Sequence, residues 1–289
     1  MKLCRFISRD DLNATRPRVG MLTSDDHVLD LSSEGIDTLA SLLEFESLLS
    51  ELERFSKLSL PHYPLDTVRL LAPVDRQEVW AAGVTYLRSK KARMEESDFS
   101  ANAYDRVYDA PRPEIFFKSL PEKVVGPGCG IGIRQDARWN VPEPELVLVL
   151  NSRKHLVGYS IGNDMSSRDI EGENLLYLPQ AKTYHKSCAM GPCIVVGASE
   201  SVARDWSIQI EIKRDGVCAF KGDTKVAQIK RTFAELIDYL TRSQNFPHGV
   251  CLLTGTGIVP GDNFTLKSGD QVDIEISGIG RLSNHVEVV

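Results

Sequence analysis

Hydrophobic positions along this chain fall into many short runs, with few stretches of helical periodicity. From about residue 70 onward, the apolar runs are bounded by glycine and proline, which is typical of strands. One helix is predicted over 231–242, where Thr232 and Glu235 fit a capping box. Many strands with sparse helices favour a β-sandwich or a rolled sheet over an alternating parallel sheet. The predicted strands of this larger part are 79–82, 115–117, 145–150, 156–161, 193–197, 208–214, 250–254 and 272–276.

The first seventy residues have a different pattern and predict a separable unit. Strands are expected over 2–7, 18–22 and 27–31. A helix is expected over 37–55, and its apolar stripe consists of Leu39, Leu42, Leu43, Leu49 and Leu52. Segment 57–73 contains three prolines and is predicted to be a connector. The chain therefore divides into a small N-terminal domain, 1–70, and a larger domain, 71–289.

Composition narrows the class of protein. Charged residues make up 26% of the 289 residues, hydrophobic ones 42%, and the net charge is −6, as in ordinary soluble globular proteins. The short basic run 88–93 does not make a nucleic-acid surface, so no nucleic-acid partner is expected. The N-terminus lacks the apolar core of a signal peptide, and no stretch reaches membrane-spanning length. We expect a cytoplasmic protein that binds no membrane, whose six cysteines are reduced because none is in a Cys-x-x-Cys pair.

Three carboxylates are the most informative polar residues. Glu143 and Glu145 flank Pro144, which forbids a helix, and residues two apart in a strand point to the same face. The apolar runs 145–150 and 156–161 are separated by turn-forming residues, which predicts a hairpin. Antiparallel pairing then brings residue 163 or so opposite Glu143. Asp164 is therefore expected beside the two glutamates.

Buried carboxylates that converge need a counter-ion. Three of them at the ends of apolar strands repel one another unless they are protonated or neutralised. Ligands that are all oxygen favour Mg²⁺, with Mn²⁺ or Ca²⁺ as alternatives, over zinc. Glu143, Glu145 and Asp164 are thus candidate metal ligands. The alternative is that Glu143 and Glu145 form the solvated face of a strand.

Several sequence phrases resemble, in order, those of the fumarylacetoacetate hydrolase superfamily. They are 83–86, 113–118, 143–146, 158–169, Lys182 with 191–192, 253–257 and 278–284. The resemblance covers roughly residues 71–289 and implies an α+β fold: a mixed β-roll or β-sandwich catalytic domain preceded by a small N-terminal α/β domain. It also implies a divalent metal on Glu143, Glu145 and Asp164, a small-molecule 2-oxo acid substrate, and a homodimer or homotetramer.

The chain departs from the hydrolytic members of that superfamily at one position. They carry a water-activating histidine in the loop corresponding to 85–93, and here Ser89 takes its place. The chain resembles most the branch that dehydrates 2-keto-3-deoxy sugar acids such as 2-keto-3-deoxyarabinonate, which implies a metal-dependent hydro-lyase. One alternative is an acylpyruvate-type hydrolase, decarboxylase or isomerase whose base is, for example, Glu95 or Glu96. Another is a catalytically silent sugar-acid- or metal-binding protein, which the intact Lys182 and carboxylate set disfavours.

Two residues are candidates for proton transfer, because the resemblance places both at substrate-facing positions. They are Lys182 and Glu114, and which is the base and which the acid stays open. Lys182 is alternatively a countercharge to the carboxylates. Glu114 is alternatively a surface residue at the start of a strand.

Substrate binding is expected from a glycine-flanked turn and a polar loop. Thr256 is a candidate for the substrate carboxylate or else an ordinary turn threonine. Lys118 is a candidate for the substrate tail or merely bounds its strand. Ser166 and Ser167 are expected to cap a helix over 168–178, which makes Arg168 structural. The candidate lid residues are Tyr86, Arg88 and Lys90.

Overall fold

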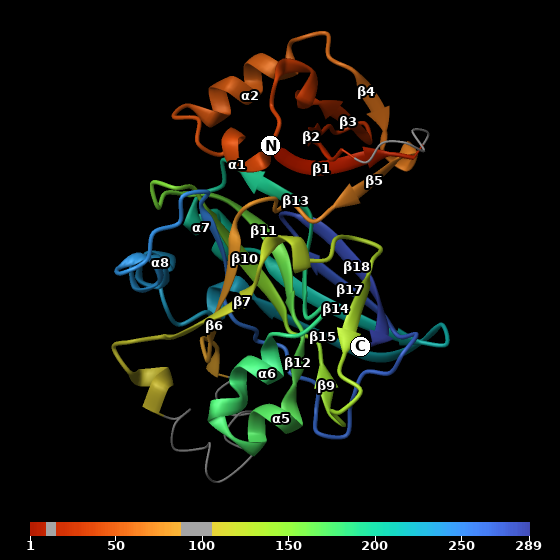
Figure 1. Cartoon of the computed structure of the whole chain (residues 1–289), viewed down its shortest axis with the longest axis vertical. Coiled ribbons are helices and arrows are strands. Elements are labelled where there is room, and N and C mark those ends of the chain that lie inside the picture. The colour runs from red at the N-terminus through yellow and green to blue at the C-terminus, as the bar shows by residue number, and fades with distance from the viewer. Residues whose placement is uncertain (10–15, 88–105) are drawn as a thin grey trace.

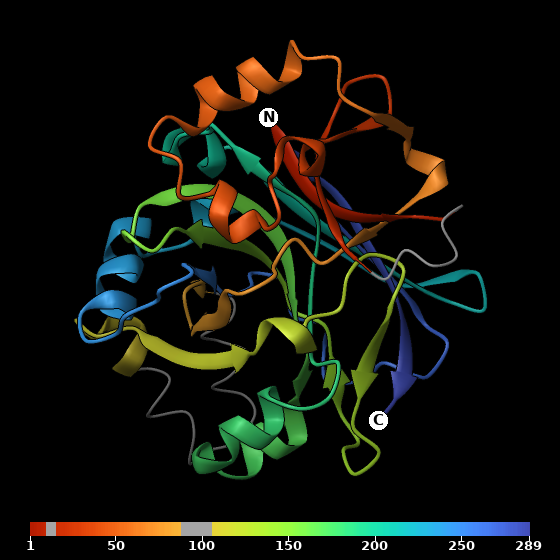
Figure 2. The ribbon, with the colours of Figure 1, turned by 45° about the horizontal axis from the view of Figure 1, so that its top comes forward.

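Two large β-sheets, a two-stranded ribbon and a few short helices make up the computed structural model, which describes residues 1–9, 16–87 and 106–289 (Figure 1). The large sheet has the strand order β4-β3-β2-β1-β13-β11-β10-β16-β6-β7, and β5 also pairs with β1. The second sheet has the order β15-β14-β17-β18-β8. The N-terminal elements lie at one end of the molecule and helices α5 and α6 at the other, as both views show (Figures 1 and 2).

The N-terminal strands continue the large sheet, because β1 pairs antiparallel with β13. All three strands predicted here are present. The strands are β1 (Lys2–Ser8), β2 (Arg18–Leu22), β3 (His27–Asp30), β4 (His62–Pro64) and β5 (Val68–Leu71). The domain boundary near residue 70 stays a prediction.

The single helix predicted over 37–55 is wrong. The structure has two, α1 (Leu39–Leu42) and α2 (Leu48–Ser56). Between them, the Glu44 carboxylate turns aside and accepts hydrogen bonds from the backbone N–H and the hydroxyl of Ser152, at 2.6 and 2.8 Å. These tertiary bonds outweigh the helical periodicity of the leucines.

The strands of the larger part match the predicted ones closely. In the large sheet they are β6 (Glu78–Gly83), β7 (Glu114–Ser119), β10 (Pro144–Leu150), β11 (Leu156–Asp164), β13 (Cys188–Val196) and β16 (Val250–Leu253). In the second sheet they are β8 (Gly130–Ile133), β14 (Ser207–Arg214), β15 (Val217–Lys225), β17 (Gln271–Ile276) and β18 (Gly280–Val288). A small ribbon pairs β9 (Asn140–Val141) with β12 (Ser166–Ser167). The strands β8, β15 and β18 were not predicted; β15 is mostly exposed and lacks an apolar alternation.

Helices are short in this part. Those whose two ends both lie in the described ranges are α5 (Arg168–Glu173), α6 (Leu178–Lys182), α7 (Glu200–Arg204) and α8 (Phe233–Thr241). The predicted helix over 231–242 is confirmed as α8, and Thr232 caps it by accepting from the Glu235 N–H at 3.1 Å. The predicted helix over 168–178 is wrong, because Asn174 is extended and interrupts it. None of the helices in the described ranges combines the length and the apolar character needed to cross a bilayer.

The core lies on both faces of the large sheet. Leu146 and Leu148 of β10 pack in a cluster shared with the second sheet, whereas Val147 and Val149 pack in a cluster shared with the leucines of α1 and α2. Because β10 is buried on both faces, it reads in sequence as a continuous apolar run. The N-terminal end of β10 carries Glu145, and Glu143 directly precedes the strand.

We expect cysteine reactivity to follow burial. All six cysteines are free thiols, as predicted, and Cys218 is exposed. Burial raises the pKa of Cys193 to about 11 and that of Cys188 to about 12, so neither forms much thiolate near neutrality. Iodoacetamide should therefore modify Cys218 first and leave Cys188 and Cys193 intact until the protein is denatured. Peptide mass spectrometry after timed labelling measures this, and early modification of either buried thiol would contradict it.

Candidate active site

Three carboxylates converge at the open end of the β10–β11 hairpin. Pro144 pairs with Asn163, and the Asp164 N–H donates to the Glu143 carbonyl at 3.0 Å. The predicted hairpin and its register are thus confirmed. One carboxylate oxygen from each of Glu143, Glu145 and Asp164 lies within 4.8 Å of the others, and all three residues are buried. The alternative of a solvated strand face is therefore wrong.

The least neutralised of the three carboxylates is Glu145. Burial, then the charges of Asp164 and Glu143, raise its pKa well above the ordinary value. The Gly255 N–H donates to its Oε2 at 2.6 Å. Among the described residues, no cation forms an ion pair with Glu145. A buried carboxylate with a raised pKa and no ion pair is stabilised in its ionised form by a cation that binds beside it.

Cations surround the other two carboxylates. The Lys182 Nζ lies 2.6 Å from Glu143 Oε2 and 3.2 Å from Asp164 Oδ2, and Lys118 Nζ lies 2.5 Å from Asp164 Oδ1. The Arg168 guanidinium donates to Glu143 Oε1 at 2.6 Å. All three cations are at most 1% exposed. Their contacts fix the carboxylates in place without reaching Glu145.

The donor set fits a hard divalent ion. It offers only oxygen atoms, they are close enough to share one ion, and the raised pKa of Glu145 shows that its ionised form lacks a compensating charge. Mg²⁺ in proteins is bound through a few carboxylates and completes its octahedron with water or substrate oxygens. Glu143, Glu145 and Asp164 are the residues that would hold it.

Metal affinity should fall in acid because of Glu145. Its pKa in the metal-free protein is raised, so a proton occupies the carboxylate over a pH range in which an ordinary glutamate is ionised. The ion must displace that proton, so the Mg²⁺ dissociation constant should rise by up to about tenfold per pH unit below this pKa. Calorimetric titration between about pH 5 and pH 8 measures this. An affinity that is flat over this range would contradict the raised pKa.

The candidate proton-transfer residues lie on elements that meet at the carboxylates. Lys182 ends α6, and its Nζ lies 5.9 Å from the centroid of the Phe116 ring. Glu114 and Phe116 alternate along β7 and so share one face of that strand, whereas the pairing of β7 with β6 is irregular at Lys118. Because the Phe116 ring lies beside the Lys182 Nζ, this shared face is the one that looks toward the lysine, and Lys118 contacts Asp164 from the irregular position. Gly83, paired with Glu114, leaves room for its side chain, since a Cβ there would overlap the Glu114 carboxylate.

The predicted substrate-binding residues that the structure describes are buried and have other contacts. Thr256 is buried, and its hydroxyl accepts from the Ile258 N–H at 3.1 Å, as in an ordinary turn. Tyr86 is 1% exposed and packs in the core against Gly257, so the described structure does not place it on an exposed lid. Lys118 is fully buried against Asp164. Arg88 and Lys90 lie outside the described residues.

Two residues near the carboxylates were interpreted differently from the sequence. Arg168, expected to be structural, contacts Glu143 directly. Ser166, expected to be a helix cap, accepts from Lys182 at 2.6 Å instead. Both residues lie within a few positions of Asp164 in the sequence, which could have indicated contacts with the carboxylates. The preference of serine for helix N-caps favoured a helix start instead.

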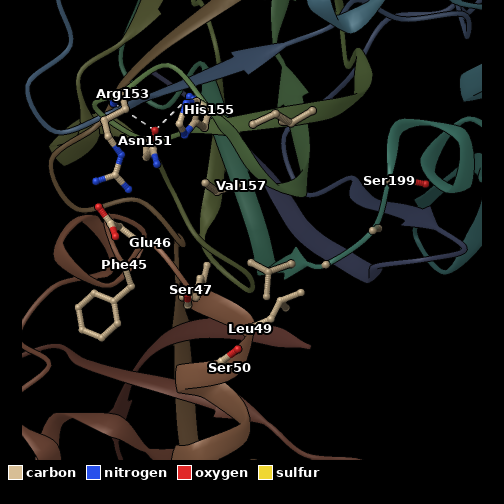
Figure 3. Close-up of a pocket in the computed structure, with 15 residues that line it drawn as sticks. Phe45, Glu46, Ser47, Leu49, Ser50, Asn151, Arg153, His155, Val157 and Ser199 are labelled. Carbon is tan, nitrogen blue, oxygen red and sulfur yellow. Dashed lines mark hydrogen bonds between the residues drawn. The ribbon is translucent and has the colours of Figure 1, made fainter.

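A groove of about 510 Å³ lies at the other end of the same hairpin (Figure 3). It runs between the start of α2, with Ser47 and Leu49, and the turn that contains Asn151. The Asn151 Oδ1 accepts from the backbone N–H groups of Arg153 and His155, at 3.1 and 3.0 Å. This asparagine therefore serves to hold the turn, and the groove is separated from the carboxylates by the length of the hairpin.

Comparison with known proteins places this arrangement in a family. Residues 78–287 match the family model described as fumarylacetoacetate (FAA) hydrolase C-terminal. The chain belongs to the fumarylacetoacetate hydrolase family. This match confirms the predicted family, and the similarity to solved structures of the family confirms the predicted mixed β fold.

Three relatives are informative. A probable 2-keto-3-deoxyxylonate dehydratase of Haloferax volcanii is 49% identical over 217 residues, which cover 75% of this chain and 74% of the relative. The 2-dehydro-3-deoxy-D-arabinonate dehydratase of Saccharolobus solfataricus is 42% identical over 233 residues, covering 79% and 78%. A solved structure of 2-keto-3-deoxy-D-arabinonate dehydratase complexed with magnesium and 2,5-dioxopentanoate is 32% identical, with a TM-score of 0.83 and coverage of 100% and 99%.

Proposed function

We propose that this family member is a Mg²⁺-dependent dehydratase that converts a 2-keto-3-deoxy pentonate into 2,5-dioxopentanoate. The identity of 49% and 42% to two dehydratases of such acids, over three quarters of the chain, carries the proposal. The buried carboxylate cluster supports it, since a solved relative is complexed with magnesium and that product. A cytoplasmic location and a homodimer or homotetramer stay predictions.

The reaction removes one water from the five-carbon acid. When bound, Mg²⁺ polarises the ketone of a 2-oxo acid and acidifies the hydrogens on C3. Loss of a C3 proton and of the C4 hydroxyl leaves a double bond between C3 and C4. A proton is then lost from C5 and another is taken up from the medium at C3, which leaves an enol between C4 and C5. This enol takes up a proton on C4 and loses its hydroxyl proton, which gives the aldehyde. No water nucleophile is needed, which agrees with Ser89 at the position of the hydrolytic histidine.

The geometry favours different roles for the two candidates. The Lys182 Nζ donates to Glu143, Asp164 and Ser166, so it is held as an ammonium and suits an acid that protonates the leaving C4 hydroxyl. Glu114 lies on the site-facing side of β7, beyond Phe116, and its carboxylate suits the base that removes the C3 proton. Phe116 between them presents an apolar surface that keeps water from the carbon chain.

A direct assay tests the proposal. The purified protein with Mg²⁺ is incubated with 2-keto-3-deoxyarabinonate and, separately, with 2-keto-3-deoxyxylonate. We expect 2,5-dioxopentanoate from at least one of them, and EDTA should stop its formation. In D₂O the product should carry deuterium at C3 and C4, because both carbons receive a proton from the medium.

Acylpyruvates are the matched control substrates. Acetylpyruvate and fumarylpyruvate share the 2-oxo acid group but lack a C4 hydroxyl that can leave. Cleavage of these compounds without dehydration of either pentonate would overturn the proposal in favour of a hydrolase.

A further inference from the structure

Two adjacent buried serines form β12, and only one of them faces the carboxylates. The Ser167 hydroxyl donates to Asn140 Oδ1 at 2.8 Å and makes no helix-capping bond. The Ser166 hydroxyl donates to the Asp164 carbonyl at 3.0 Å and accepts from the Lys182 Nζ at 2.6 Å. We propose that Ser166 is a positioning residue that keeps the Lys182 ammonium from moving closer to Asp164 Oδ2 than the observed 3.2 Å. This inference rests on the proposed function for the role of Lys182.

The hydroxyl of Ser166 has a fixed direction. It carries a single hydrogen, and that hydrogen is used on the Asp164 carbonyl. Toward Lys182 the oxygen therefore acts only as an acceptor, so it stabilises an N–H donor at that point. Asp164 itself meets the same ammonium through its carboxylate, at 3.2 Å. Lys182, Ser166 and Asp164 thus close a ring of hydrogen bonds around one ammonium group.

The ring places the ammonium between two kinds of acceptor. On one side it contacts Glu143 Oε2 at 2.6 Å and Asp164 Oδ2, two residues that would hold the metal; on the other side it contacts the neutral oxygen of Ser166. Ser166 is fully buried and Lys182 is 1% exposed, so bulk water does not replace a lost acceptor. Without the serine oxygen, the ammonium loses its neutral acceptor, and the pull of the two carboxylates is no longer balanced on that side. The ammonium then moves toward them and competes with Mg²⁺.

The test compares variants of the two serines. Ser166→Ala removes the acceptor, Ser166→Cys keeps a side chain of similar size with a weak acceptor, and Ser167→Ala is the matched control at the neighbouring buried position. For both Ser166 variants we expect Mg²⁺ affinity, measured by calorimetry without substrate, to fall about 3- to 10-fold, and kcat to fall about 10- to 100-fold at nearly constant KM. Ser167→Ala should stay within about 3-fold in both measurements.

A double-mutant cycle provides the decisive readout. In a Lys182→Met background there is no ammonium to hold, so Ser166→Ala should change Mg²⁺ affinity by less than about 2-fold. Additive effects in the cycle, a wild-type affinity for Ser166→Cys, or equal losses for Ser166→Ala and Ser167→Ala would each overturn the inference. Because the cycle measures metal binding alone, it stays valid if the pentonate assay fails. Conversely, dehydration by the wild type says nothing about the serine.

Discussion

Replacing Glu145 by glutamine is expected to abolish Mg²⁺-dependent turnover and, at the same time, to stabilise the metal-free protein. Turnover should fall by at least about 10³-fold because one of three oxygen ligands loses its charge. The metal-free fold should gain about 1 kcal/mol because a buried carboxylate that repels Asp164 and Glu143 is replaced by a neutral group. The amide oxygen of the glutamine still accepts the hydrogen bond from Gly255.

Glu143→Gln is the matched control, and we expect the opposite sign for stability. Glu143 accepts from both Lys182 and Arg168, so a neutral side chain leaves two buried cations short of an anion. The metal-free variant should lose about 3 kcal/mol, as when one partner of a buried ion pair is removed. Both variants should lose turnover. Urea denaturation in EDTA measures the two stabilities, and shifts in the same direction would contradict the charge distribution described above.

The part of the site that lies on the β10–β11 hairpin could be predicted from the sequence. Its geometry is local: two apolar runs, one turn and a fixed antiparallel register bring Asp164 beside Glu143. Pro144 excluded the helical alternative that a Glu-x-Glu pattern otherwise permits. The register of the hairpin was predicted to within a few residues. The observed register lies within that range and brings the three carboxylates together.

Two of the three cations of the site, Lys118 and Arg168, were not placed beside the carboxylates from the sequence, because tertiary packing decides their partners. Lys118 comes from β7, whose sequence does not indicate a contact with the hairpin, and Arg168, although close to Asp164 in sequence, was interpreted as the start of a helix. The same reason explains the break between α1 and α2. There, Glu44 binds Ser152, which is more than a hundred residues away, and leucine periodicity carries no information about that contact.

Replacing Lys182 by methionine is expected to remove turnover while Mg²⁺ binds more tightly. The ammonium lies 2.6 Å from Glu143 Oε2 and 3.2 Å from Asp164 Oδ2, so it occupies oxygens that the metal needs and repels the ion. Two unit charges 4 Å apart interact by about 4 kcal/mol at the effective dielectric of a protein, so relief of even part of this repulsion should tighten Mg²⁺ binding by about 10-fold or more. The metal-free variant should be less stable, because Glu143 and Asp164 lose a buried partner.

This variant also separates the two roles considered for Lys182. If the lysine were only a countercharge, bound Mg²⁺ would take over that task, and Lys182→Met would dehydrate the substrate normally once saturated with metal. If it is the acid for the C4 hydroxyl, turnover should stay at least about 10³-fold below wild type at saturating Mg²⁺, because the methionine has no proton to donate. Lys182→Arg keeps the charge but changes the geometry of the donors. It should therefore restore the stability of the metal-free protein without restoring turnover, and a fully active arginine variant would return the lysine to a purely electrostatic role.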